Sequence, residues 1–167
     1  YYYVFAYGDP LRAYRLVNGL FNTTASSVNK AITNADPRIG FSVSAHNSVP
    51  ESGILWLTTV ASDTLPSAGT LHALNAANVA QELWNSDMEG SRDTLGGFSK
   101  FGNPTVANGK VFAPTATNKI AVYGLLPNVP GVASVVNAAS FQSSFIAPGE
   151  LITLFGDAIG PASALSG

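Results

Sequence analysis

The sequence predicts an all-β protein from its composition, its turn signals and the shortness of its apolar segments. Only 11% of the 167 residues are charged, and polarity comes mainly from Ser, Thr, Asn and Gly, which favours strands joined by turns over helices. Turn signals such as Asn108-Gly109 and Pro148-Gly149 recur at short intervals and leave few windows long enough for an ordinary helix. Several apolar segments between them have apolar residues on both faces, which is typical of stacked sheets.

Turn signals bound each expected strand. Runs rich in aromatic and β-branched residues between such signals are typical of strands. The expected strands are 2–7, closed by Gly8-Asp9-Pro10; 11–16, closed by Asn18-Gly19; 41–45 and 53–60, separated by a hairpin that ends at Ser52-Gly53; 70–75 and 81–85, entered after Ser67-Ala68-Gly69; 104–107, 110–115 and 119–125, entered after Gly96-Gly97; and 134–137 and 150–155, separated by Pro148-Gly149.

Three short segments repeat along the chain. PLRAY (10–14), TLHAL (70–74) and KIAVY (119–123) share an aliphatic residue at the second place, Ala or Val at the fourth, and Tyr or Leu at the fifth. They begin 60 and then 49 residues apart, which is near the span of one four-stranded propeller blade. Asn108-Gly109 is a two-residue type I′ hairpin signal of the kind that joins strands within a blade. The repeats therefore predict blades.

A partial β-propeller is expected over residues 1–126, with two antiparallel blades and a remnant. The remnant is 1–24, and the blades are 25–86 and 87–126. We expect Trp56 to be largely buried in a blade strand, and Trp84 to be largely buried between blades.

The repeat that runs from Gly69 to Ser86 reads G-x-L-x-A-L-N-A-x-N-x-A-x-E-L-W-N-S, and PTVANGKVF and KIAVYGLL follow it. This pattern resembles the quinoprotein-like (PQQ-type) β-propeller repeats of large exported proteins, especially those of Acidobacteria. The resemblance implies that Trp84 packs between adjacent blades. Asn78-Val79 stands where the family's docking motif has Thr-Gly, so quinone binding is not carried over and no cofactor is expected.

A second resemblance follows a Pro-rich linker at 127–133. The segment VVNAASFQSSFIAPGELITLFGDAIGP (135–161) is similar to the start of an Ig-like C-terminal domain of secreted acidobacterial proteins. It implies the first strands of an Ig-like β-sandwich over 134–167, which is a truncated domain. Pro148-Gly149 is expected to form a type II turn, because Pro presets φ at its second place and Gly supplies a positive φ at its third.

Charge and cysteine content exclude several function classes. The formal net charge is −2 and no basic patch is visible, so nucleic acid is not an expected partner. The chain has no cysteine, which excludes disulfides, thiolate metal sites and thiol nucleophiles. No apolar run approaches the roughly 18 residues of a spanning helix, so no membrane span is expected.

Candidate ligands for a metal are few. Asp87, Glu89 and Asp93 lie on one acidic segment, and oxygen ligands from one loop can hold calcium, but the spacing lacks the pattern of an EF-hand and favours a solvated loop. His46 lies in a polar hairpin and His72 in a strand, with no His or carboxylate at ligand spacing. We expect an exposed tip at His46, a satisfied strand histidine at His72, and no metal site.

Other candidate residues also have a structural interpretation. The aromatic run Tyr1, Tyr2, Tyr3, Phe5 and Tyr7 could form a carbohydrate-stacking platform, but alternating aromatics in a strand are more often core. Asn22-Thr23-Thr24 formally matches a glycosylation acceptor. No Gly-x-Ser-x-Gly elbow is present, so no catalytic residue is assigned.

The expected function is that of a non-catalytic extracellular module, part of a secreted propeller plus Ig-like protein used in surface adhesion, scaffolding or filament assembly. The alternative is a fragment of a quinoprotein-like dehydrogenase or a propeller hydrolase whose active site lies in further blades. The expected partner is other polypeptide, either the rest of the same protein or neighbouring copies in a homo-oligomer or filament. It would complete the sheets and cover blade faces that expose Leu11, Leu71 and Ile120.

Overall fold

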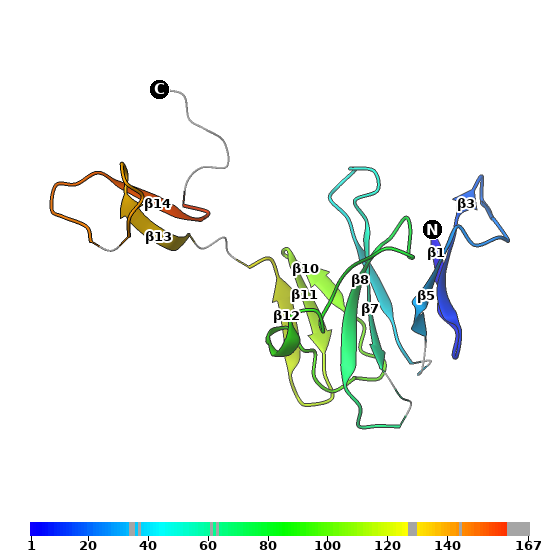
Figure 1. Ribbon diagram of the computed structural model, residues 1–167. Coiled ribbons are helices and arrows are strands. Elements are labelled where there is room, and N and C mark those ends of the chain that lie inside the picture. Colours follow the sequence, from blue (N-terminus) through cyan, green and yellow to red (C-terminus); the bar gives the residue numbers. More distant parts are fainter. Residues whose placement is uncertain are drawn as a thin grey trace. The chain divides into compact units, whose positions relative to one another are not determined.

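The computed structural model confirms the all-β class (Figure 1). It describes residues 1–33, 36, 38–60, 62, 64–126, 130–143 and 145–159. Within these ranges there is no α-helix, and the only helical element is a 3-10 turn, η1 (Gly90–Arg92). The described residues include no helix long and apolar enough to cross a membrane. The chain divides into two compact units, Tyr1–Leu125 and Leu126–Gly167.

The first sheet of the larger unit has the strand order β1-β2-β5. Its strands are β1 (Tyr2–Val4), β2 (Pro10–Tyr14) and β5 (Ser27–Thr33). The sequence pattern placed no strand at β5 and assigned its residues to the second repeat unit, whereas β5 pairs antiparallel with β2 in the structure. The first sheet therefore contains a segment that sequence reasoning gave to the next one.

A small hairpin separates β2 from β5. Its strands are β3 (Leu16–Val17) and β4 (Leu20–Phe21). Asn18 and Gly19 connect them with φ values of 50° and 79°, which is the left-handed geometry of a type I′ turn. The expected single strand over 11–16 is thus divided into β2 and β3.

The second sheet is a four-stranded antiparallel meander in the order β6-β7-β8-β9. Its strands are β6 (Phe41–Ser44), β7 (Ile54–Val60), β8 (Gly69–Asn75) and β9 (Glu82–Asn85). The central pair β7–β8 is regular along its whole length. Its β-branched and aliphatic residues suit a sheet covered on both faces.

The third sheet has the order β10-β11-β12. Its strands are β10 (Thr105–Ala107), β11 (Lys110–Pro114) and β12 (Ile120–Gly124). Asn108 and Gly109 have φ values of 50° and 69°, so the predicted type I′ hairpin between β10 and β11 is confirmed.

The three repeated segments occupy β2, β8 and β12, which have equivalent places in their sheets. In the second sheet, β8 pairs with β7 before it and with β9 after it. In the first sheet, β2 pairs in the same way with β1 and β5. In the third sheet, β12 pairs with β11 and ends the sheet. The first sheet thus matches strands two to four of the second, and the third matches strands one to three.

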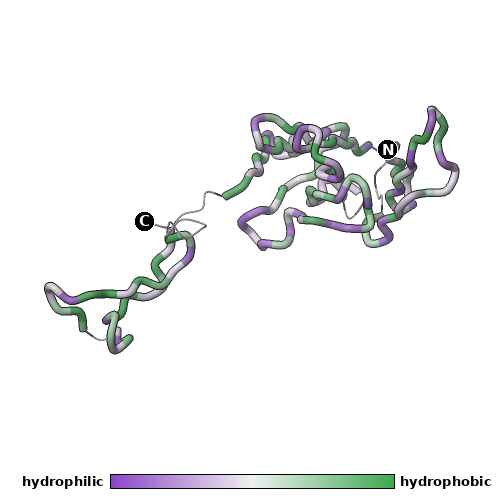
Figure 2. The backbone as a smooth tube through the Cα atoms, turned by 90° about the horizontal axis from the view of Figure 1, so that it is seen from above, coloured by the Kyte–Doolittle hydropathy of each residue, from purple (hydrophilic) through white to green (hydrophobic). Residues whose placement is uncertain are grey.

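The three sheets lie side by side in Figure 1, and a hydrophobic core fills the space between each neighbouring pair. Figure 2 shows hydrophobic and hydrophilic stretches alternating along the first unit, as such layers require. The first core joins the first and second sheets, and the second core joins the second and third. The buried residues of the first core are Phe5, Leu11, Ala13, Ile32, Leu55, Leu57, Leu74, Ala76 and Val79, and those of the second are Leu71, Leu95, Val111 and Ala113.

The two tryptophans are largely, although not completely, buried, as expected. Both pack against the second core. The Trp84 ring lies 5.4 Å from the ring of Tyr123 in an edge-to-face arrangement, and the indole N–H of Trp56 donates to Ser44 Oγ over 2.9 Å. Trp84, on β9 of the second sheet, thus contacts the third sheet through Tyr123, as expected.

Because most of the Trp84 side chain is buried, we expect Trp84→Ala to lower the free energy of unfolding by about 2–4 kcal/mol. The loss combines one aromatic pair with most of the area of one ring, and it approaches the loss of about 3–5 kcal/mol for a fully buried Trp. Urea unfolding followed by circular dichroism measures the difference. A loss below about 1 kcal/mol would mean that Trp84 does not pack between the second and third sheets.

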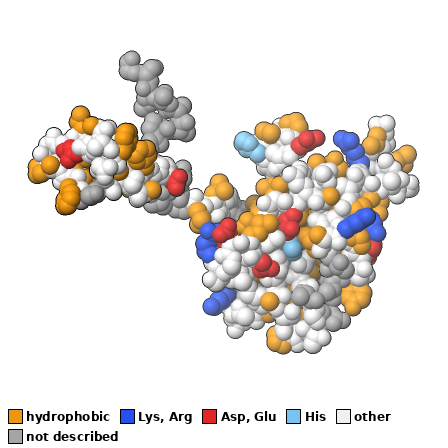
Figure 3. All heavy atoms as spheres, in the orientation of Figure 1, with side chains coloured by type: hydrophobic (Ala, Val, Ile, Leu, Met, Phe, Trp, Pro, Cys, Tyr) orange, Lys and Arg blue, Asp and Glu red, His pale blue; other side chains and the backbone are white. Residues whose placement is uncertain are grey.

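The smaller unit contains one antiparallel pair, β13 (Gly131–Asn137) and β14 (Ile152–Asp157). In the connection between them, Gly149 has a φ of 84°, and the Glu150 N–H donates to the Ala147 carbonyl over 3.2 Å. The predicted Pro148-Gly149 turn is confirmed by this geometry. Figure 3 shows hydrophobic side chains spread over the surface of this unit, and the phenyl ring of Phe145 is among the most exposed.

Asn137 and Glu150 hold the β13–β14 connection. Asn137 Oδ1 accepts hydrogen bonds from the backbone N–H groups of Ala139 (2.8 Å) and Ser140 (2.7 Å), and its side-chain amide donates to Glu150. The other carboxylate oxygen of Glu150 accepts from the Ala147 N–H over 2.7 Å. These bonds explain why an Asn and a Glu flank this segment, because both satisfy backbone donors outside a sheet.

Candidate functional site

A hydrogen-bonded network crosses three strands of the second sheet. His72 on β8 has its Nε2 atom 2.8 Å from Thr59 Oγ1 on β7 and its Nδ1 atom 2.6 Å from Glu82 Oε1 on β9. The amide of Asn85 donates to the same Glu82 oxygen over 3.1 Å. An ionised carboxylate only accepts, so we assign the imidazole proton to Nδ1 and let Nε2 accept from the Thr59 hydroxyl.

The order hydroxyl, imidazole, carboxylate is also that of a hydrolase triad, but here it serves a buried side chain. Thr59 and His72 are only 9% and 7% exposed. Both polar atoms of the imidazole have partners inside the sheet, so the network satisfies a histidine whose burial would otherwise be costly. His72 therefore has a partner for each ring nitrogen, as predicted. Because Thr59 is buried, its hydroxyl has little room for a substrate.

Sequence reasoning missed Glu82 as the partner of His72. The two residues are ten positions apart in the sequence. The connection between β8 and β9 turns the chain back, and a register shift between Ala73 and Leu74 pairs Leu74 with Glu82. A β-bulge of this kind re-aims side chains. The β8–β9 hairpin was the available signal, but the bulge that brings the carboxylate beside the ring was not visible in the pattern.

Asp87 and Asp93, in the acidic segment 87–93, bind different partners. Asp87 accepts a hydrogen bond from Thr70 Oγ1 over 2.7 Å, and Asp93 makes a bidentate pair with Arg92, with both distances 2.7 Å. The hydrogen bonds from Arg92 lower the pKa of Asp93. In the described part of the chain, no group of three or more His, Cys, Asp or Glu residues could hold a metal ion.

The phenol of Tyr123 lies within the electrostatic influence of this acidic segment. Its oxygen is buried and has no hydrogen-bond partner among the described residues. Burial raises the pKa of Tyr123 to about 12, and the negative charges of Asp93 and Asp87 add to the effect. The folded state therefore holds the phenol proton more tightly than the unfolded chain does.

This shift predicts a loss of stability at alkaline pH. Because the pKa of Tyr123 is higher in the folded state than its ordinary value of about 10, the favourable contribution is complete below about pH 10 and is lost as the pH rises to about 12. We expect Tyr123→Phe to weaken the fall in stability across this window. At neutral pH the variant should be at least as stable as the parent, since it removes an unpaired buried hydroxyl. Urea unfolding at pH 8, 10 and 11 measures both, and an unchanged pH dependence would contradict the assignment.

The aromatic run at the N-terminus divides between core and surface. Phe5 belongs to the first core, and the Tyr3 hydroxyl donates to the Ala76 carbonyl over 2.7 Å. Tyr1, Tyr2 and Tyr7 are exposed, so the core expectation is wrong for these three. They do not make one stacking face, because Tyr1 stacks on Tyr3 while Tyr2 contacts Phe21.

The remaining sequence candidates lie on the surface. His46 is exposed in the turn between β6 and β7, where its backbone N–H donates to Ser52 Oγ over 3.0 Å. Asn22 is also exposed, and its side-chain oxygen accepts from the Thr24 N–H over 3.2 Å. The structure does not bring either residue together with another candidate.

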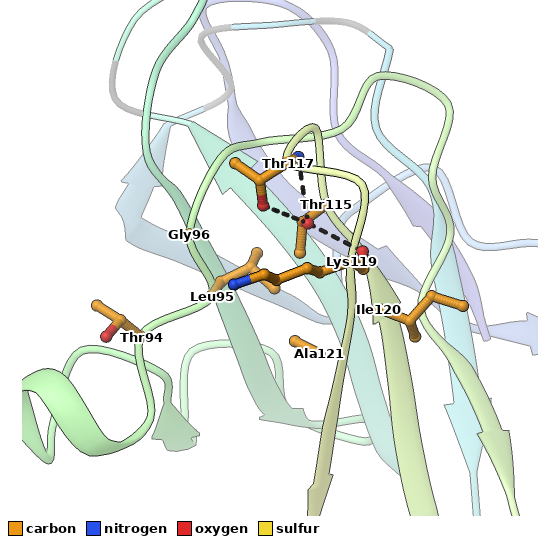
Figure 4. Close-up of a pocket in the computed structure, with 8 residues that line it drawn as sticks. All are labelled: Thr94, Leu95, Gly96, Thr115, Thr117, Lys119, Ile120 and Ala121. Atoms are coloured by element: carbon orange, nitrogen blue, oxygen red, sulfur yellow. Dashed lines mark hydrogen bonds between the residues drawn. The ribbon is translucent and has the colours of Figure 1, made fainter.

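A pocket of about 270 Å³ lies at the start of β12 (Figure 4). Thr115 Oγ1 is 2.8 Å from Thr117 Oγ1 and donates to the Lys119 carbonyl over 2.9 Å. The Lys119 side chain extends toward Leu95 in Figure 4. The lining residues are Thr94, Leu95, Gly96, Thr115, Thr117, Lys119, Ile120 and Ala121.

The outer face of the third sheet exposes apolar residues at repeat positions that are buried in the other two sheets. Ile120 and Val122, the second and fourth residues of the third repeat, are 65% and 52% exposed. The corresponding residues of the first and second repeats are Leu11, Ala13, Leu71 and Ala73, and all of them are buried. The expectation that Leu11 and Leu71 lie on open faces is therefore wrong, and only the expectation for Ile120 is confirmed.

No protein-family model, curated protein or solved structure matches this chain.

Proposed function

We propose that the chain is a non-catalytic extracellular module of the β-propeller type, followed by an Ig-like segment, and that it binds other polypeptide through the outer face of its third sheet. The observation that carries the proposal is the exposure of Ile120 and Val122 at repeat positions that are buried elsewhere. The extracellular location rests on the resemblance of the repeats to those of exported proteins. Adhesion, scaffolding or filament assembly are uses of such a surface.

The internal repeat supplies the reason for this surface. In the first sheet, Leu11 and Ala13 are covered by the second sheet, and in the second sheet Leu71 is covered by the third. The third sheet has Ile120 in place of Leu71 and the larger Val122 in place of Ala73, and none of the described residues of the larger unit covers them. Burying an Ile or a Val side chain contributes about 1.5–3 kcal/mol, so a further sheet on this face would be held by the same interaction as the two existing contacts.

The partner that fits best is another sheet of the same repeat, either from the same protein or from a neighbouring copy. Its contacting face would be apolar and flat, like the faces that cover Leu11 and Leu71. Figure 3 shows Lys and Arg interspersed with Asp and Glu over the face in view. The exposed side chains of Ile120 and Val122 are therefore taken as the main determinant of the contact between sheets.

Sedimentation velocity tests the proposal. We expect the chain to self-associate in a concentration-dependent manner, because a second copy can supply the cover that no described residue of the larger unit supplies. Ile120→Asp combined with Val122→Asp should shift the population to monomer. Val49→Asp is the matched control, because Val49 is equally exposed but lies in the turn between β6 and β7.

Circular dichroism establishes that the double variant keeps its fold. Equal sedimentation of the double variant and the parent chain would overturn the proposal, as would an effect of Val49→Asp as large as that of the double variant.

A further inference from the structure

β12 is the edge of its sheet, whereas its counterpart β8 is followed by β9. Comparison of these two strands shows what β9 and the residues after it contribute. Ala73 pairs with Trp84. Leu71 exchanges two hydrogen bonds with Ser86: the Ser86 N–H donates to the Leu71 carbonyl over 2.9 Å, and the Leu71 N–H donates to Ser86 Oγ over 3.0 Å.

The backbone of β12 presents the same groups at a free edge. The Thr115 N–H donates to the Lys119 carbonyl over 3.0 Å, so Lys119 faces β11. Because bonding directions alternate along an antiparallel strand, the N–H and C=O groups of Ile120 and Val122 point away from β11. Ile120 and Val122 correspond to Leu71 and Ala73 in the repeat, so the groups that bind the segment at β9 in the second sheet are open in the third.

Two residues that line the pocket correspond in the repeat to the residues that contact Ser86 and Asp87 in the second sheet. Lys119 and Ile120 line the pocket, and their repeat counterparts Thr70 and Leu71 contact Asp87 and Ser86. Lys119 places a cation where Thr70 donates to the carboxylate of Asp87. A carboxylate that entered this pocket would therefore meet a complementary charge.

We propose that the free edge of β12 binds one more antiparallel strand, with an aromatic residue opposite Val122 and a Ser-Asp pair that enters the pocket at Ile120 and Lys119. This inference deepens the proposed function and rests on it. The residues 84–87 of the chain, Trp-Asn-Ser-Asp, define the pattern. Backbone bonding gives such strand addition its affinity, and the side chains give it its specificity. An aromatic residue opposite a β-branched one is a favourable cross-strand pair.

A labelled peptide with the sequence of residues 80–88, AQELWNSDM, is the probe for the full chain. We expect saturable binding in fluorescence anisotropy and slower hydrogen exchange at the amides of Ile120 and Val122. A control peptide with Ser86→Pro should not bind, because Pro removes the N–H that in the second sheet donates to the Leu71 carbonyl.

A charge exchange tests the predicted register. Lys119→Glu should weaken binding of the peptide by about tenfold, and the peptide carrying Asp87→Lys should restore it. Lys110→Glu, on the neighbouring strand β11, is the matched control and should leave binding unchanged.

The outcomes separate this inference from the proposed function. Absence of peptide binding, or binding without protection at Ile120 and Val122, overturns the edge site and leaves the sedimentation result for the sheet face standing. Equal effects of Lys119→Glu and Lys110→Glu overturn the proposed register. Sedimentation that does not depend on Ile120 and Val122 overturns the proposed function even if the peptide binds.

Discussion

Replacing Leu71 by Ala is expected to lower the free energy of unfolding by about 2–5 kcal/mol, the range for a fully buried Leu. Leu71 is completely buried in the second core, where it is grouped with Leu95 and Val111. The truncation would leave a cavity between two sheets whose backbones are fixed by their own hydrogen bonds, so little relaxation is available. Urea unfolding followed by tryptophan fluorescence measures the loss, because Trp56 and Trp84 pack against the same core.

Ile120→Ala is the matched control for this measurement. Ile120 occupies the same place in the third repeat but is exposed, so its truncation should change the free energy of unfolding by less than about 0.5 kcal/mol. A cost at Ile120 similar to that at Leu71 would mean that the third sheet is covered in solution. A cost near zero at both positions would contradict the packing of the second sheet on the third.

The repeat was the part of the fold that the sequence made visible. An aliphatic residue followed two places later by Ala or Val marks β2, β8 and β12 because these positions point to the same side of each strand. Asn-Gly pairs also identified their turns, since few other residues adopt positive φ so readily. Local rules thus determine these features, and a single sequence is enough to recognise them.

β5 was missed because its buried positions do not alternate. Asn29 and Ile32 are the buried residues of this strand, and they are three apart, which a strand allows only where its register shifts. The ladder between β2 and β5 has such a shift next to Leu11. The polar Asn29 also lowers the mean hydropathy of this strand, so the sequence of 27–33 resembles that of a loop.

The candidate residues were harder to predict than the strands. Burial of His72 followed from its strand, but its contact with Glu82 depends on a bulge. The open face at Ile120 depends on which sheet ends the stack, and no local pattern contains that information. Contacts between strands distant in sequence are set by tertiary packing, which local patterns do not record.

Asn29 joins β5 to the turn between β8 and β9, and it does so as a buried polar side chain. Its amide donates to the Val79 carbonyl over 2.9 Å, and its side-chain oxygen accepts from the N–H groups of Ala31 (2.9 Å) and Ile32 (3.1 Å). The residue is 3% exposed. Each of these backbone groups depends on Asn29 in a region where water is a poor substitute.

Asn29→Ala is therefore expected to lower the free energy of unfolding by about 3–4 kcal/mol, because it leaves one carbonyl and two N–H groups unpaired at roughly 1–3 kcal/mol each, with partial relaxation. Ser27→Ala is the control: Ser27 Oγ accepts one hydrogen bond, from the Val79 N–H over 3.0 Å, so its loss should cost about 1 kcal/mol. Urea unfolding followed by circular dichroism compares the two. If Asn29→Ala costs no more than Ser27→Ala, then Asn29 does not hold the β8–β9 turn against the first sheet, and the pairing of β5 with β2 loses its main tertiary support.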